Sequence, residues 1–298
     1  MNSYTHLRYL PFGLILLALG TASAQNGNEN TIEPGNTYRF ATHLFEEGEY
    51  LRAAIEYQRY IYSAPTMPTN ADSVLYKIGL CYRMGGKPPA AINYFRKIHD
   101  EHPNSPLIEE AHYEIAFSYL LSGQGQKSMK YIGTHMRLIQ DDQEVLKMQK
   151  LVGLNYLRLR KWDIASALMD SLGKLDPGNP LVISTAALAK EGQNLPHKNK
   201  ALAGLYSSVI PGAGKVYCGR STDGLFSLLM IGLTGWQAYE GFHKDGVRSV
   251  KGWVYGSIGG VLYLGNIYGS VVTAQIFNEE QEAKISLKVK VLINAQAH

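Results

Sequence analysis

The stretch LYKIGLCYRMGGKPPAAINYFRKIHDEHP, from Leu75 to Pro103, decides the fold of this chain. Small residues at Gly79 and Ala91 allow two helices to cross closely, because the distance between helix axes depends on the side chains at the contact. Gly86 suits the turn between the helices, and Pro103 ends the second helix. The stretch therefore predicts one antiparallel helix pair.

The same pattern recurs between residues 35 and 180 at intervals of 38, 37 and 37 residues. Its first small position is held in each copy by Ala41, Gly79, Ala116 and Gly153. Twelve residues later, each copy has a second small residue: Ala53, Ala91, Ser128 and Ala165. Each pair leaves an apolar face open, so we expect the pairs to stack into a solenoid.

These positions resemble those of the tetratricopeptide repeat. The resemblance implies an all-α fold in which residues 35–192 form four repeats and a capping helix. The pattern departs from the family, because the spacing exceeds the usual ~34 residues and the family's tryptophan position is not kept. Arg160 also replaces the turn glycine of the fourth copy. The alternative is a generic helical bundle with an accidental period.

The first helices of such repeats line a concave groove that binds proteins or peptides. By resemblance, the residues that line the groove of this chain are Tyr38, Phe45, Tyr76, Leu80, Arg83, Tyr113, Phe117 and Lys150. This aromatic surface suits an extended peptide or an inserted helix. The alternative is that these side chains pack against the chain's own capping helix or linker.

The N-terminus has the pattern of a signal peptide over residues 1–24. Arg8 precedes a short apolar run at residues 10–19, and small residues follow at positions 22–24. The pattern predicts export, which places residues 35–192 outside the cytoplasm. Residues 193–200 are predicted as a linker.

The composition changes after Lys200, and residues 201–278 are predicted as a membrane domain. Two long apolar segments, near 224–240 and 252–277, are predicted to span a bilayer as a helical hairpin. Trp236 and Trp253 flank the polar link between them, as aromatic residues do at a membrane interface. The alternative is a pair of buried helices. The predicted fold class is therefore an all-α solenoid followed by a transmembrane hairpin.

Glycines give this region two further patterns. Close helix packing in lipid is predicted, within the hairpin or between two copies of the chain, at Gly252, Gly256, Gly260, Gly265 and Gly269. A run before the hairpin resembles the opening signature of small two-span membrane domains, carried by Pro211, Gly212, Gly214, Tyr217, Gly219 and Arg220. Because the glycines could also pack against a second copy of the chain, the pattern leaves open whether the chain forms homo-oligomers.

The tail, residues 279–298, has a mixed pattern. It begins helically, and then Ile285, Leu287, Val289 and Val291 alternate with polar residues in the period-two pattern of a strand. A strand that pairs with a partner and a frayed end both fit this pattern.

The sequence contains no constellation of catalytic residues, so we expect no enzyme, no cofactor and no metal site. Gly214-Lys215 lacks the first glycine and the Ser or Thr of a phosphate-binding loop. The net charge of +4 is mild and its basic residues are dispersed, which argues against nucleic-acid binding.

The sequence favours a membrane-anchored scaffold of the cell envelope that binds proteins or peptides. The expected location is the inner membrane of a Gram-negative-type envelope, with the repeats in the periplasm and the hairpin in contact with the lipid bilayer. The alternative is an accessory subunit of an inner-membrane insertion, secretion or transport complex, in which the hairpin is the working part.

Overall fold

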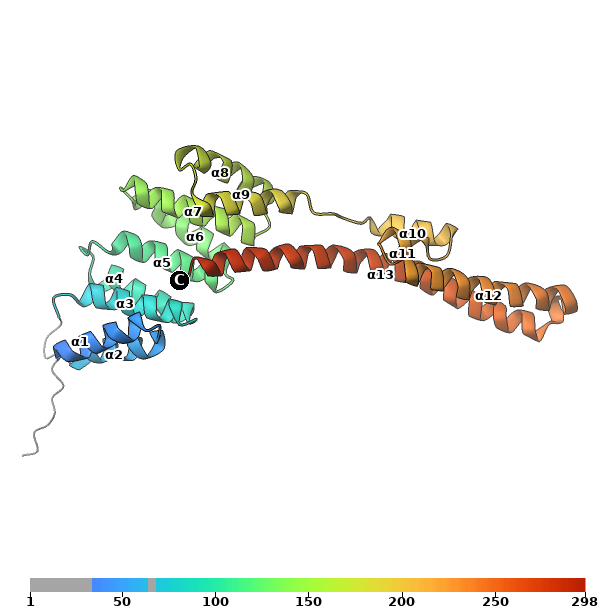
Figure 1. Cartoon of the computed structure of the whole chain (residues 1–298), viewed down its shortest axis with the longest axis horizontal. Coiled ribbons are helices and arrows are strands. Elements are labelled where there is room, and N and C mark those ends of the chain that lie inside the picture. The colour runs from blue at the N-terminus through green and yellow to red at the C-terminus, as the bar shows by residue number, and fades with distance from the viewer. Residues whose placement is uncertain (1–33, 64–67, 298) are drawn as a thin grey trace, which may run out of the picture.

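The computed structural model describes residues 34–63 and 68–297, and the predicted signal peptide lies outside these ranges (Figure 1). Every secondary-structure element among the described residues is a helix, and no strand occurs among them. The repeat domain consists of α1 (Pro34–Glu46), α2 (Tyr50–Ser63), α3 (Ala71–Met84), α4 (Pro88–Glu101), α5 (Ile108–Leu121), α6 (Gly125–His135), η1 (Met136–Leu138), α7 (Asp142–Arg158), α8 (Trp162–Leu175) and α9 (Pro180–Gln193). The remainder consists of α10 (Lys200–Val209), α11 (Ala213–Tyr217), α12 (Ser221–Asp245), η2 (Gly246–Arg248) and α13 (Val250–Ala295).

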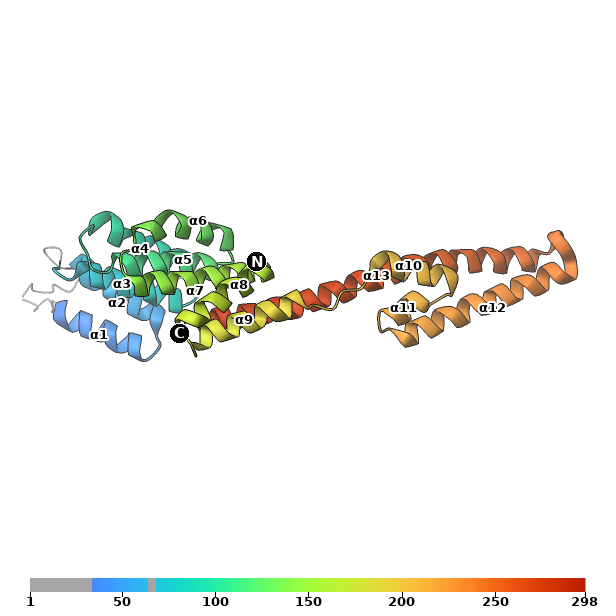
Figure 2. The ribbon, with the colours of Figure 1, turned by 90° about the horizontal axis from the view of Figure 1, so that it is seen from above.

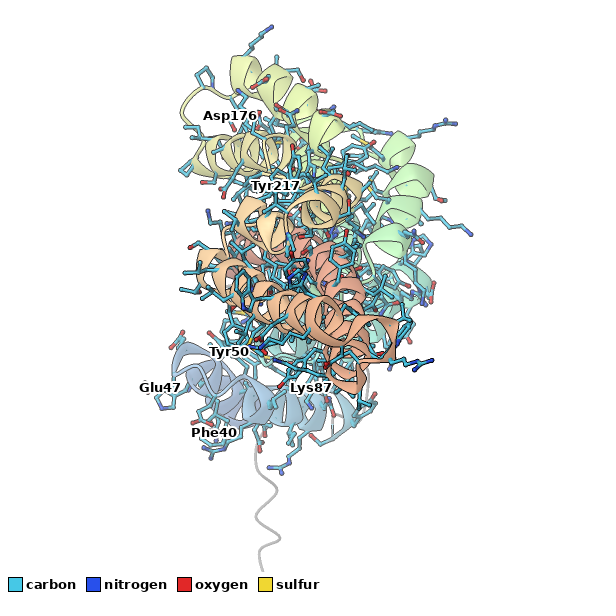
Figure 3. The ribbon with its side chains drawn as sticks, turned by 90° about the vertical axis from the view of Figure 1, so that its right-hand side faces the viewer. Phe40, Glu47, Tyr50, Lys87, Asp176 and Tyr217 are labelled. Carbon is cyan, nitrogen blue, oxygen red and sulfur yellow. The ribbon has the colours of Figure 1, made fainter. Side chains whose placement is uncertain are left out.

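Helices α1 to α8 form four antiparallel pairs that stack side by side, as the periodic pattern predicts. Figure 3 looks along the molecule from the α12 end and shows the first pair, with Phe40 and Tyr50, opposite the loop that carries Asp176. The predicted small positions lie at the crossings. A Cβ atom added to Gly79 would lie 2.4 Å from the Phe95 ring, and one added to Gly153 would lie 2.2 Å from Met169. The all-α repeat architecture is confirmed.

Each turn between the two helices of a pair has one residue with left-handed backbone dihedral angles. Gly48, Gly86 and Gly123 adopt φ values of 79°, 73° and 76°. Arg160 adopts φ 57° at the matching position of the fourth pair, and it is the one residue other than glycine with a positive φ in the described part of the chain. A side chain is disfavoured in this conformation by about 1–2 kcal/mol.

Three histidines pack together on the second and third pairs. The His112 ring lies 4.5 Å from that of His135 and 5.2 Å from that of His99, measured between ring centroids. Burial, with the two neighbouring imidazoles, lowers the pKa of His112 to about 4. The His112 ring is therefore neutral at physiological pH and shares a 2.7 Å hydrogen bond with the Tyr131 hydroxyl.

The C-terminal part extends away from the solenoid as a narrow arm. Figure 2 shows α12 running antiparallel to the first half of α13, with α10 and α11 at the base of this hairpin. The two apolar segments near 224–240 and 252–277 do form paired helices. However, no helix within the described ranges combines the length and the apolar character needed to cross a membrane. The predicted transmembrane spans are corrected accordingly, because glycines and the amides Gln237 and Asn266 dilute their apolar content.

The tail is helical, so a strand or a frayed end is the wrong interpretation. Helix α13 runs without interruption for 46 residues, from the tip of the arm back to the repeats. Ile285, Val289 and Ile293 are buried, and their spacing of four residues gives one stripe along the helix. The alternating pattern arises because exposed Leu287 and Val291 lie between them.

The close crossing at Gly79 predicts a strong steric penalty. Gly79→Ala should lower the free energy of unfolding by roughly 1–3 kcal/mol, because the new methyl group overlaps the Phe95 ring. Gly133→Ala is the matched control, since a Cβ on α6 at this position meets no atom within 4 Å. The control should be neutral or stabilising by up to about 1 kcal/mol. Urea denaturation of both variants measures the difference, and equal effects would contradict the predicted crossing.

Candidate protein-binding groove

The first helices of the pairs, α1, α3, α5 and α7, form one face of the repeat domain, on which α5 lies beside α7. The last turns of α13 lie against this face, in its C-terminal half (Figure 2). The groove therefore has two halves. The end of α13 fills the C-terminal half, and the N-terminal half, on α1 and α3, is not covered by α13.

The predicted groove residues of the N-terminal half are partly exposed and pack within the first two helix pairs. Tyr38 accepts a 2.9 Å hydrogen bond from Lys77 Nζ. Phe45 lies edge-on to Tyr50 with the ring centroids 5.5 Å apart, and Tyr76 packs against Phe95 at the same distance. Leu80 joins the apolar core of this half. These side chains therefore form a partly exposed aromatic surface, and contacts with neighbouring side chains hold them in place.

The C-terminal half of the groove holds the apolar stripe of α13. Val289 and Ile293 are 2% and 3% exposed. They share a core with groove-facing side chains from α5 and α7, which are Phe117, Leu120, Leu151, Leu154 and Leu157. Burying an aliphatic side chain of this size contributes about 1.5–3 kcal/mol, so apolar contact is the main force that seats the helix.

A buried ion pair marks the point where α13 ends. The Arg83 side chain donates a 2.6 Å hydrogen bond from Nη1 to the carbonyl oxygen of Ala297. Its Nε lies 2.7 Å from Glu114 Oε2, and both side chains are about one-tenth exposed. The guanidinium also stands 5.6 Å from the centre of the Phe117 ring. Arg83 therefore links the groove wall to the backbone carbonyl oxygen of Ala297.

Polar contacts at the rim orient the incoming helix. Lys288 pairs with Glu191 of α9 at 2.5 Å, and Arg160 pairs with Glu282. Both pairs are about half exposed, and exposed pairs of this kind contribute roughly 0–1 kcal/mol each. They therefore fix the position of α13 more than they stabilise it.

Tyr113 and Tyr76 lie near the buried carboxylate. Burial, followed by the charge of Glu114, raises the pKa of both phenols above the ordinary value. Both hydroxyls therefore remain protonated and available as hydrogen-bond donors. Lys147 Nζ stands 4.5 Å from the centre of the Tyr113 ring, which partly balances the negative charge nearby.

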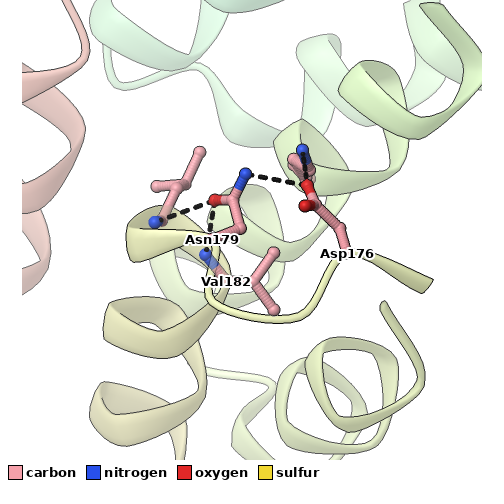
Figure 4. Close-up of polar contacts among 5 residues, drawn as sticks. Asp176, Asn179 and Val182 are labelled. Atoms are coloured by element: carbon pink, nitrogen blue, oxygen red, sulfur yellow. Dashed lines mark hydrogen bonds and ion pairs between the residues drawn. The ribbon is translucent and has the colours of Figure 1, made fainter. Parts of the chain in front are cut away.

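The predicted groove residue Lys150 serves the loop before α9. Figure 4 shows Asn179 capping that helix by accepting hydrogen bonds from the backbone N–H groups of Leu181 and Val182. Asn179 Nδ2 donates to Asp176 Oδ2 at 2.8 Å, and Lys150 Nζ donates to the same oxygen at 2.6 Å. The contact with Lys150 lowers the pKa of Asp176. The Lys150 amine is thus held away from the aromatic part of the groove.

The membrane-domain signature residues form a tight junction at the base of the arm. Gly212 has φ 86°, and a Cβ there would lie 2.0 Å from the carbonyl oxygen of Gly224. A Cβ at Gly214 would lie 1.9 Å from the carbonyl oxygen of Ala203. Pro211 precedes this turn, whereas Gly219 and Arg220 precede α12, and Tyr217 accepts a hydrogen bond from the backbone of Asn199. These residues specify a helix junction, and the likeness to a two-span membrane domain finds no support.

A buried polar network holds this junction to α13. Asn266 Oδ1 accepts the N–H of Gly212 at 3.1 Å, and Asn266 Nδ2 donates to the carbonyl oxygen of Ser207. The hydroxyls of Ser207 and Ser270 lie 2.7 Å apart. Since each buried polar group has a partner, the network fixes how α10 and α11 sit on α13.

The predicted glycine face of α13 is only partly used within the chain. A Cβ on Gly252 would meet the Phe242 ring at 2.7 Å, and one on Gly256 would lie 3.9 Å from Ala238. Gly269 faces the Lys215 side chain, whereas a Cβ on Gly260 or Gly265 would meet no atom within 4 Å. The hairpin contact therefore uses the glycines nearest the tip.

Stacked antiparallel helix pairs with small residues at the crossings define an all-α helical-repeat protein. Residues 73–105, which comprise most of α3 and all of α4, match the tetratricopeptide repeat family. No curated protein matches the chain. A tetratricopeptide repeat is therefore present in the second helix pair, as the Gly79 to Pro103 pattern predicts.

The contact between α13 and the groove predicts different results for two neighbouring positions. Ile293→Asp places a carboxylate among apolar side chains, so the end of α13 should detach and the amide hydrogens of residues 285–295 should exchange at least ~10-fold faster. Val291→Asp is the matched control, because Val291 is 61% exposed on the same helix. Equal exchange in the two variants would show that the stripe does not seat the helix.

Proposed function

We propose that this chain is a non-enzymatic scaffold that binds a helical or extended segment of a partner protein in the groove of its repeats. The observation that carries the proposal is the seating of α13 in the same groove. There, an apolar helical stripe shares a core with side chains of α5 and α7. Arg83 donates a hydrogen bond to a backbone carbonyl oxygen just after the end of this helix. The tetratricopeptide repeat at residues 73–105 supports this class of function, because such repeats generally mediate protein–protein contacts.

The proposed site is the half of the groove on α1 and α3. Tyr38, Phe45 and Tyr76 are partly exposed there, and aromatic side chains provide large contact areas for a bound peptide. A cleft of about 300 Å³ next to the last residues of α13 is lined by Arg83, Met84 and Leu121, among others. A partner segment would lie along the groove beyond the point where α13 ends.

We also propose that the arm associates with a lipid bilayer. Large apolar side chains are exposed along its length, including Phe226, Leu229, Leu233, Trp236, Val261 and Leu264, and each is more than half exposed. Contiguous apolar surfaces of this kind are rare on monomeric soluble proteins and mark sites of protein or membrane contact. The proposal places the repeats in the periplasm and the arm at the inner membrane, in keeping with the export pattern of residues 1–24.

Photo-crosslinking tests the groove. A photoreactive phenylalanine at Tyr38 or Tyr76 should form discrete cross-links to a partner protein in the source cell. The same group at Tyr62, which is 69% exposed on α2, is the control and should form none of them. Cross-links confined to this chain would contradict a partner site, and cross-links only to integral membrane proteins would favour the accessory-subunit alternative. Circular dichroism melting of each variant verifies that the repeats are intact.

Vesicle flotation tests the arm. The double variant Leu229→Lys and Leu264→Lys should lose most of its binding to phosphatidylcholine vesicles, because two charges replace apolar side chains at the proposed lipid contact. The control is Ile55→Lys with Leu175→Lys, two exposed apolar positions of the repeats. An equal loss in both double variants, or none in either, would contradict lipid contact through the arm.

A further inference from the structure

A cleft of about 410 Å³ lies between α12 and α13, close to the base of the arm. Its walls are mainly apolar and comprise Phe226, Met230, Ile231, Val261, Leu262 and Gly265. Its volume lies within the range of about 300–1,000 Å³ that is typical of small-molecule sites. The cleft shares no lining residue with the cleft beside the last residues of α13 in the repeats.

One end of the cleft is polar and carries a cation. Lys215, Ser227 and Asn266 line this end. Lys215 Nζ donates a 2.7 Å hydrogen bond to Ser227 Oγ, which itself donates to the carbonyl oxygen of Asp223. An ammonium group has three donors, so this contact leaves two of them unused. Across residues 34–63 and 68–297, no carboxylate oxygen lies within 4.0 Å of the Lys215 amine.

The surroundings of Lys215 are also positively charged. Residues 195–239 contain four basic side chains, Lys198, Lys200, Lys215 and Arg220, and one acidic side chain, Asp223. Asp223 lies 3.7 Å from Arg220, so its charge is already matched. An anion at the polar end of the cleft would therefore meet the unpaired charge of Lys215 in a segment with an excess of basic residues.

The geometry points to a binding site for one anionic phospholipid, with a phosphate oxygen on the Lys215 amine and an acyl chain along the apolar walls between α12 and α13. The charge of Lys215 accounts for the phosphate group of such a ligand, and the apolar walls account for its acyl chain. A free phosphate would leave the apolar walls unused, and an uncharged lipid would leave the two remaining donors of the Lys215 amine without an anion. The inference goes beyond the proposed scaffold role, because it concerns a defined site for a single lipid molecule.

Gly265 and Gly260 provide a matched pair of variants. A Cβ on either glycine meets no atom of the chain within 4 Å, but only Gly265 lines the cleft. Gly265→Leu should therefore fill the place of the acyl chain without disturbing the hairpin, and Gly260→Leu adds the same side chain elsewhere on α13. Both replace glycine within a helix by a residue with higher helix propensity.

The charge has its own pair of variants. Lys215→Gln removes the cation from the cleft. Lys251→Gln removes a cation at the far end of the arm, where Lys251 Nζ lies 2.7 Å from Glu240. Circular dichroism of all four variants verifies that they fold.

Native mass spectrometry of the full chain in nonionic detergent, titrated with dioleoylphosphatidylglycerol, tests the site. We expect one lipid per chain, with binding weakened about 10-fold or more by Lys215→Gln, as for a lost hydrogen bond between charged groups. Gly265→Leu should weaken binding to a similar degree, whereas Gly260→Leu and Lys251→Gln should leave it unchanged. Phosphatidylcholine should bind more weakly, and millimolar inorganic phosphate should not compete.

Three results would overturn the proposal. Unchanged binding in Gly265→Leu would remove the acyl chain from the cleft. Equal losses in Lys215→Gln and Lys251→Gln would show general electrostatic attraction rather than a site. Effective competition by inorganic phosphate would show a free-anion site. Because the measurement uses detergent, its outcome is independent of vesicle flotation and of groove binding.

Discussion

The apolar stripe at the end of α13, seated against α7 and α9 with side chains of α5 in the same core, is the contact on which the arrangement of the molecule depends. A helix of 46 residues is about 69 Å long at the usual rise per residue. Most of the stability of a helix in a protein comes from packing against other elements. Helix α13 has such packing at both ends, against α12 in the arm and against the groove in the repeats, so one continuous element joins both parts.

The repeats could be predicted from sequence because their information is local and repeated. Small residues at Gly79 and Ala91, followed by Pro103, describe one crossing of two helices, and the register recurs at constant spacing. The occupant of the groove could not be predicted in the same way. Ile285, Val289 and Ile293 carry the helical period, but Leu287 and Val291 between them create the period of a strand. Only burial distinguishes the two sets.

The arm shows a different limit of sequence reasoning. Its apolar composition predicted contact with lipid, but the polar side chains Asn266 and Ser270 gave no sign of their partners, because Ser207 and Gly212 lie more than 50 residues away in the chain. In the fold they form the network that seats α10 and α11 on α13. Composition therefore described the outer surface of the arm, whereas its inner contacts required the tertiary structure.

Arg160 shows how the repeats are adapted to α13. Arg160 occupies the turn of the fourth pair at the position that glycine occupies in the first three pairs. A residue with a side chain at φ 57° raises the conformational free energy by about 1–2 kcal/mol. A glycine would remove that strain, but it would also remove the guanidinium that contacts Glu282 and Ser286 of α13. The strained residue thus stands at the turn beside α13, while the other three turns keep glycine. The contact of Arg160 with α13 explains why this turn keeps a residue with a conformational cost. That contact orients the long helix where it reaches the groove.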